Sequence, residues 1–359
     1  VQVIDIVDID SNTGEARFEL AERELTTIDD FEGLQSRYFQ VLRGGTLKAR
    51  DVAGSLVVDA EFSGGDSPAL RYDIEGGVIV PLDYSTLAML SATYQLEQVM
   101  LDLGASIGVG ADEIVADGRY DLLFEPSIQQ EGDISATITI KFNAFYLPGA
   151  RQFGLARRSR FEEIPLAANR LVLAHEFGHA LFEIGFTGSA NVECDSGASN
   201  SDPFFPGRFD IEYATRGLNE GFADIMSFAN AGAINVLSGS GFDADERSLL
   251  GTTFTFSQLS SNICAGEFYC IGTLFARSVF EAFMSDGGDP TDLASRGALG
   301  ADVFTALSAT QDLMRQRADL PAPRQTISEC EVGEDFSAAN DTAIVASFLG
   351  AFVEAIDEP

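Results

Sequence analysis

Two histidines, the only ones in 359 residues, stand four positions apart in the run His-Glu-Phe-Gly-His from His175 to His179. On a helix this spacing puts both imidazoles on one face, one turn apart. The apolar residues around the run predict a buried helix that starts at Pro165 and ends just before Gly185. Two imidazoles so placed are typical ligands of one zinc ion. Glu176, between them, can then accept a proton from a water on the metal and pass it to a leaving amine.

A second apolar run, residues 218–228, supplies the further ligand that such a centre requires. A catalytic zinc ion has three protein ligands and an open fourth position. Glu220 and Asp224 lie four apart on the predicted helix, so one carboxylate can bind the metal while the other holds a histidine N–H. Taken separately, each pair also fits a helix without metal, with satisfied histidines and a solvated acidic edge. The two patterns in one chain favour the metal centre.

Together the two motifs resemble those of the thermolysin and fungalysin group of zinc metallopeptidases, the gluzincins. In that group His-Glu-x-x-His is followed, on a second helix, by Asn-Glu-x-x-x-Asp or Gly-Glu-x-x-x-Asp. The resemblance implies that His175, His179 and Glu220 bind one zinc ion. It also implies that Glu176 is the general base and that Asp224 holds the N–H of His175 that does not face the metal.

A strand is predicted at residues 134–142, where apolar and polar residues alternate, and it ends in Asn-Ala-Phe-Tyr at residues 143–146. This ending resembles the Asn-Ala-Phe-aromatic segment of thermolysin-like enzymes. The resemblance implies that Asn143 and Ala144 lie on an edge strand whose backbone pairs with an extended peptide substrate, a mode of binding that does not depend on sequence. An ordinary half-buried strand is the alternative.

Two tyrosines are candidates for stabilising an oxyanion. The segment that starts at Tyr269 resembles a fungalysin segment in which a histidine has this role, and no third histidine exists here. A phenol can donate one hydrogen bond to a developing oxyanion. Tyr213, seven residues before Glu220, lies near the place of a second oxyanion donor in thermolysin-like enzymes. For Tyr269 a buried structural role is an equal alternative.

The chain departs from the resemblance in two further places. Leu171 and Ala231 replace the acids of thermolysin's paired calcium site, and residues 8–14 favour a hairpin turn over a calcium loop, so Ca²⁺ is unsupported. The interval between the two zinc motifs is also longer than in either family. It contains an insertion at residues 187–212, which predicts a long surface loop near the cleft.

Composition restricts the partners. With 56 Asp and Glu against 22 Lys and Arg, the net charge of −34 disfavours nucleic acid and anionic membranes, because phosphate contacts need cations. No apolar run is long enough for a membrane span or a cleavable signal segment. Four cysteines suit two disulfides, in any of three pairings, with reduced buried thiols as the alternative. We expect a monomer that meets peptide or protein substrates in an extracellular, periplasmic or cell-surface location.

The predicted elements give an α+β fold with a thermolysin-like two-part architecture. The first eighty residues favour strands, and helices are predicted at 83–103 and, after the insertion, nearly throughout. Strands are expected at 1–7, 17–20, 38–42, 55–62 and 77–80, and the later helices at 218–230, 268–284, 301–314 and 341–356. We expect a β-rich N-terminal domain, 1–190, which includes 1–80 as a candidate separate β segment. A mainly helical C-terminal domain, 191–359, would follow, with the zinc site in the cleft between them.

These observations predict a secreted zinc endopeptidase that hydrolyses peptide bonds with metal-activated water and Glu176 as general base. The alternative is a non-catalytic zinc protein, used in adhesion or peptide capture, with a degenerate peptidase site. The intact Glu176 favours the enzyme, and the absent oxyanion histidine favours the alternative.

Overall fold

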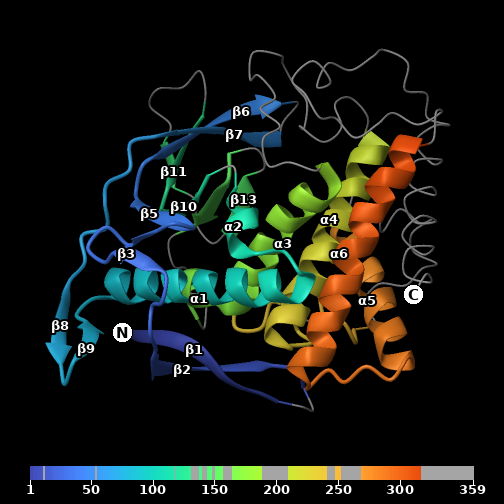
Figure 1. Cartoon of the computed structure of the whole chain (residues 1–359). Coiled ribbons are helices and arrows are strands. Elements are labelled where there is room, and N and C mark those ends of the chain that lie inside the picture. Colours follow the sequence, from blue (N-terminus) through green and yellow to red (C-terminus); the bar gives the residue numbers. More distant parts are fainter. Residues whose placement is uncertain are drawn as a thin grey trace.

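A computed structural model shows a mixed α+β fold, with a β-rich N-terminal region followed by a helical C-terminal region (Figure 1). The residues that the structure describes are 1–10, 13–52, 55–116, 118–130, 137–139, 144–147, 150–156, 164–187, 209–240, 247–251 and 268–316. The expected α+β class is therefore confirmed at this level. The division into domains at residue 190 stays a prediction.

The first eighty residues form strands where alternation predicted them. The strands β1 (Gln2–Ile9) and β2 (Ala16–Glu22) pair antiparallel, and Gly14 with a positive φ of 70° closes the turn between them. A short pair, β8 (Tyr72–Glu75) and β9 (Val78–Pro81), precedes the first helix. The hairpin turn predicted at residues 8–14 is thus confirmed.

Two larger sheets combine early strands with later ones. The six-stranded sheet has the order β13 (Ala144–Leu147), β14 (Gln152–Leu155), β10 (Tyr120–Phe124), β5 (Phe39–Arg43), β4 (Gln35–Ser36) and β3 (Ile28–Asp30). The four-stranded sheet has the order β12 (Thr137–Thr139), β11 (Ser127–Gln130), β6 (Thr46–Val52) and β7 (Ser55–Ser63). The strand β10 lies parallel to both β5 and β14, and β11 lies parallel to β6. Residues of the first eighty therefore share both sheets with residues beyond 120.

The prediction of a single strand from 134 to 146 is wrong in one respect. Its described parts are two strands in two different sheets, because β12 pairs with β11 whereas β13 pairs with β14. Apolar alternation indicates only that a segment is extended, and it does not specify which neighbour that segment pairs with.

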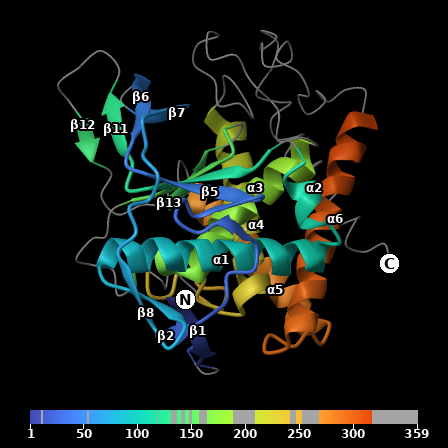
Figure 2. The ribbon, with the colours of Figure 1, turned by 60° about the vertical axis from the view of Figure 1, so that its left-hand side comes forward.

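The long helix α1 (Tyr84–Ile107) lies at the centre of the molecule, between the six-stranded sheet and the β1–β2 hairpin (Figures 1 and 2). The side chain of Asp83 caps its start by accepting from the N–H of Thr86 at 2.8 Å, and Gly108 ends it in the left-handed conformation, with φ of 72°. Most of its length is buried, since other elements pack on several sides of it. The short helix α2 (Ala111–Ile114) follows.

In the described part of the C-terminal region there are four further helices: α3 (Arg170–Thr187), α4 (Phe209–Ala231), α5 (Phe268–Ser285) and α6 (Leu293–Gln316). They confirm the helices predicted at 218–230, 268–284 and 301–314, whereas 341–356 lies outside the described residues. No described helix is both long enough and apolar enough to cross a membrane.

An aromatic core connects the six-stranded sheet to α3. The ring of Phe153 lies 5.3 Å from that of Tyr120 and 6.3 Å from that of Phe177, measured between centroids. Phe177 is the central residue of the His-Glu-Phe-Gly-His run and is fully buried. Its burial against the sheet fixes the rotation of α3 and so directs the flanking histidines away from the sheet.

Candidate metal centre

The helix that carries both histidines begins later and ends later than the sequence predicted. Pro165 precedes a short 3₁₀ turn, η1 (Leu166–Ala168), and Asn169 then caps α3 through its side-chain oxygen, which accepts from the N–H of Leu171 at 3.0 Å. Gly185 lies inside the helix, and α6 approaches closely there. A Cβ at Gly185 would lie 3.0 Å from a methyl carbon of Leu307. The glycine is explained by this close packing and not by a helix end.

Glycines also bring α3, α4 and α5 close together at the centre. A Cβ on Gly178 would lie 2.7 Å from the Cα of Ala223, so α3 and α4 cross with almost no side chain between them. On the other side of α4, a Cβ on Gly221 would lie 2.3 Å from the backbone oxygen of Gly272 in α5. The crossing at Gly178 thus places the histidine run of α3 next to the part of α4 that carries Glu220.

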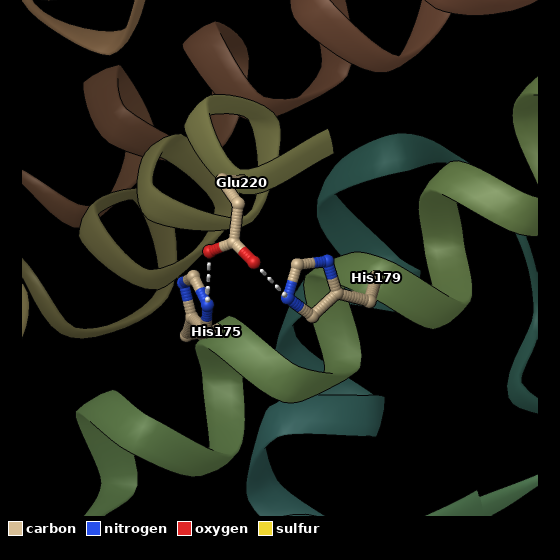
Figure 3. A group of neighbouring side chains, drawn as sticks. All are labelled: His175, His179 and Glu220. Carbon is tan, nitrogen blue, oxygen red and sulfur yellow. Dashed lines mark ion pairs between the residues drawn. The ribbon is translucent and has the colours of Figure 1, made fainter. Parts of the chain in front are cut away.

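Both Nε2 atoms face the carboxylate of Glu220 (Figure 3). The distance from His175 Nε2 to Glu220 Oε2 is 3.3 Å, and that from His179 Nε2 to Glu220 Oε1 is 3.7 Å. The candidate donor atoms all lie within 4.8 Å of one another, so the three residues are close enough to hold one metal ion. Among the residues that the structure describes, this is the one group of three that meets that condition.

The two distances from the histidine nitrogens to Glu220 fit a tetrahedral ion of the size of zinc. Ligand distances of about 2.0 to 2.2 Å from such an ion imply about 3.4 Å between neighbouring ligand atoms. The two measured distances bracket this value. The side chains are also largely withdrawn from water, with 7% of His175, 13% of His179 and 15% of Glu220 exposed.

The other nitrogen of each imidazole meets an oxygen, which leaves Nε2 for the metal. His175 Nδ1 lies 3.0 Å from Asp224 Oδ1, although the angle departs from that of a well-aligned hydrogen bond. His179 Nδ1 lies 2.9 Å from Asn219 Oδ1. Such contacts fix the tautomer and the ring orientation of metal-binding histidines. Asp224 thus stands where the sequence placed it, and Asn219 is a support that sequence reasoning missed despite its place in the Asn-Glu-x-x-x-Asp pattern.

Arg247 is the major residue that sequence reasoning missed. Its guanidinium donates to both oxygens of Asp224, at 3.0 and 2.7 Å, and to Glu220 Oε2 at 3.0 Å. Burial lowers the pKa of Arg247, but the Asp224 and Glu220 carboxylates outweigh this effect and raise the pKa above its usual range. Nothing in the local pattern around position 247 signals this role, because the contact joins a loop to a helix more than twenty residues away.

The charges of the metal-free centre shift several pKa values. Burial raises the pKa of Glu176 to about 7, with the nearby Glu220 adding to the rise and His175 opposing it. For His175, burial lowers the pKa, but hydrogen bonding to Asp224 and Glu220 prevails and raises it to about 9. Burial lowers the pKa of His179 to about 4 against the attraction of Glu220. For Glu220, burial alone would raise the pKa, and the neighbouring cationic groups lower it well below its usual range. A carboxylate with a pKa near neutrality, as in Glu176, is suited to accept and return a proton.

The two candidate tyrosines stand differently. Tyr269, in the first turn of α5, stacks on Arg247 with 4.9 Å from the guanidinium carbon to the ring centroid, and 44% of the residue is exposed. Burial of its phenol, followed by the nearby Glu220, raises the pKa of Tyr269 above its usual value. It therefore lies at the rim of the centre, not in the core. Tyr213 belongs to α4, but its side chain lies outside the described part of the chain.

Among the strands that the structure describes, the expected substrate strand lies at one edge of its sheet, next to α3. The strand β13 ends the order of the six-stranded sheet and begins at Ala144, whereas Asn143 lies outside the described residues. The insertion at 187–212 also falls almost entirely outside them. Of the cysteines, Cys270 is described and forms a disulfide, which overturns the reduced-thiol alternative for this residue. Its partner lies outside the described residues.

Comparison of the sequence with protein-family models gives no match, and comparison with curated proteins gives no significant match.

Proposed function

We propose that this protein is a zinc-dependent endopeptidase of the gluzincin type, with a thermolysin-like arrangement around the metal. The observation that carries the proposal is the convergence of two imidazole Nε2 atoms and one carboxylate, from α3 and α4, at the spacing of a tetrahedral ion. Two nitrogens and one oxygen form a donor set that zinc accepts in catalytic sites, where a fourth position stays open. His175, His179 and Glu220 would hold the zinc ion.

When bound, zinc would polarise the scissile carbonyl and make a neighbouring water more acidic. Glu176 takes the proton from that water at its carboxylate and later delivers it to the departing amine. Asp224 and Asn219 keep the imidazoles in the required orientation. Tyr269, at the rim, is the candidate donor to the developing oxyanion, with Tyr213 as the second candidate.

The substrate of this proposal is a peptide or protein that adds to β13 at Ala144, on the side where none of the described strands pairs with it. The disulfide at Cys270 supports a location outside the cytoplasm, since disulfides persist in oxidising compartments. The net charge of −34 supports peptide substrates over nucleic acid. We expect the protein to act as a monomer without a membrane span.

A non-catalytic zinc protein is the second candidate, favoured by the tyrosine in place of an oxyanion histidine. One experiment separates the two. Zinc content and cleavage of a quenched peptide are measured for the wild type, for Glu176→Gln, and for Glu281→Gln as a control at an exposed glutamate of α5. We expect about one zinc ion per chain in all three. Cleavage should fall about 10² to 10⁴-fold in Glu176→Gln alone.

Activity that survives Glu176→Gln would overturn the mechanism. Stoichiometric zinc with no cleavage by the wild type would favour the non-catalytic protein. A wild type that binds no zinc would overturn both.

A further inference from the structure

Two polar contacts connect the strand β13 to α3, the helix that carries His175 and His179, and both involve Tyr146. The phenol of Tyr146 donates to Glu183 Oε2 at 2.6 Å, and both residues are buried. The backbone N–H of the same residue faces the carboxylate of Glu176 closely enough to lower its pKa. One strand residue thus contacts two glutamates of α3.

The two glutamates are seven residues apart, which is about two helical turns or about 10.5 Å along the axis, and they share one face. Side chains on a helix lean toward its N-terminus, so the carboxylate of Glu183 extends back toward Glu176. The tyrosine spans the remaining distance, with its backbone at Glu176 and its hydroxyl at Glu183. A shorter apolar side chain could fill core volume here but could not bridge these two points.

The same contact defines which backbone groups of β13 face outward. Because amide directions alternate along a strand, Ala144 points its N–H and C=O to the same side as Tyr146, whose N–H faces Glu176. That side is the one on which Glu176 lies. The groups that would pair with a peptide are therefore held in register with the carboxylate that would act as base.

The hydrogen bond itself is of a strong kind. Burial, followed by the neighbouring Glu183 charge, raises the pKa of Tyr146 well above its usual value, which keeps the phenol protonated as a donor. A buried hydrogen bond to a carboxylate is short and charge-assisted, so it is stronger than a bond between neutral groups. The pair therefore resists displacement of β13 along α3.

We propose that Tyr146 and Glu183 are positioning residues that fix the substrate edge of β13 relative to Glu176. This inference rests on the proposed peptidase function for its effect on catalysis. The position of β13 relative to α3 depends on this hydrogen bond whether or not the protein is a peptidase.

The test uses Tyr146→Phe, which removes only the hydroxyl, Glu183→Leu, which removes the acceptor, and the double variant. Glu183→Gln keeps a carbonyl acceptor, and Tyr94→Phe is the matched control at a buried tyrosine of α1. We expect kcat/KM to fall about tenfold in each of the two disruptive variants and no further in the double variant, because both remove one interaction. Glu183→Gln should retain most of the activity, and Tyr94→Phe all of it.

The fall should be large for long peptides, in both kcat and KM, and small for short ones, since only long peptides use the strand edge. Zinc content should stay unchanged. Independently of activity, hydrogen exchange of residues 144–147 should become at least about tenfold faster in Tyr146→Phe than in Tyr94→Phe. Additive losses in the double variant, or unchanged exchange, would overturn the inference. If Glu183→Leu does not fold, the result for Tyr146→Phe alone tests the inference. A wild type without peptidase activity would reject the proposed function. Hydrogen exchange would then still test whether the position of β13 depends on Tyr146.

Discussion

Replacing Arg247 with leucine should destabilise the metal-free protein strongly and the zinc-loaded protein less. The guanidinium makes three hydrogen bonds, two to Asp224 and one to Glu220, and only 10% of its side chain is exposed. Removing one partner of a buried ion pair costs about 3 to 5 kcal/mol, because a charge stays buried without compensation. For a chain of 359 residues the entropy of unfolding is about 0.75 kcal/mol per kelvin, so a loss of about 4 kcal/mol lowers the melting temperature by about 5 K.

Bound zinc changes this expectation because its charge would neutralise Glu220, whereas Asp224 would stay without its arginine. We therefore expect the loss in free energy of unfolding to be about half as large with zinc as without it. Urea denaturation of the chelator-treated and zinc-loaded proteins measures both values. Arg247→Lys retains charge but loses the fork that contacts two carboxylates, and it should fall between leucine and wild type. Arg17→Leu is the control at an exposed ion pair with Glu19 and should change stability by less than about 1 kcal/mol.

An Arg247→Leu protein as stable as the wild type in the absence of metal would refute the reasoning. An equal loss in free energy of unfolding with and without zinc would also refute it, because the charge of the ion would then not compensate for the missing arginine.

Two other predictions concern pH and helix packing. In the metal-free protein the pKa of His175 is about 9, above the value of about 6.5 in an unfolded chain. The stability from this proton is complete below about pH 6.5 and is lost as the pH rises through 9, so urea midpoints should fall between pH 7 and 9, and flat midpoints would contradict the assignment. Gly221→Ala should lower the free energy of unfolding by about 1 to 3 kcal/mol, because the new methyl group meets the Gly272 oxygen. Thermal melts measure this loss. Gly297→Ala is the control and should show no such loss, because the nearest neighbour there is the movable hydroxyl of Ser106.

The strands and helices were largely predictable because each depends on local periodicity. Alternation located β1, β2, β5, β7 and β9, and helical spacing located α1 and the later helices. The parallel pairings of β5 with β10 and of β6 with β11 were not predictable, since they join segments about eighty residues apart. The same limit explains why one predicted strand became β12 and β13 in separate sheets: local pattern describes extension, and long-range packing decides the partner.

The residues that could hold a metal ion were predictable for a related reason. The pairs His175 with His179 and Glu220 with Asp224 are each four residues apart, so each pair occupies one face of one helix whatever the rest of the chain does. The glycines that let these helices approach were visible in the sequence but had no pattern that named their neighbours. Arg247 had no pattern at all, because it is defined by the contact it makes across the fold.

The charge balance of the centre connects Arg247 to the metal. Glu176, Glu220 and Asp224 contribute three carboxylates and Arg247 one cation, so with neutral imidazoles the group has a net charge of −2, which one divalent ion balances. Without the ion, Asp224 and Glu220 raise the pKa of His175 against the effect of burial, whereas burial, with a smaller contribution from Glu220, raises the pKa of Glu176. If Arg247 were absent the charge would be −3, and a divalent ion would leave one negative charge buried and unpaired. In the proposed metal centre, the arginine thus adjusts an acidic group of side chains to the charge of one divalent cation.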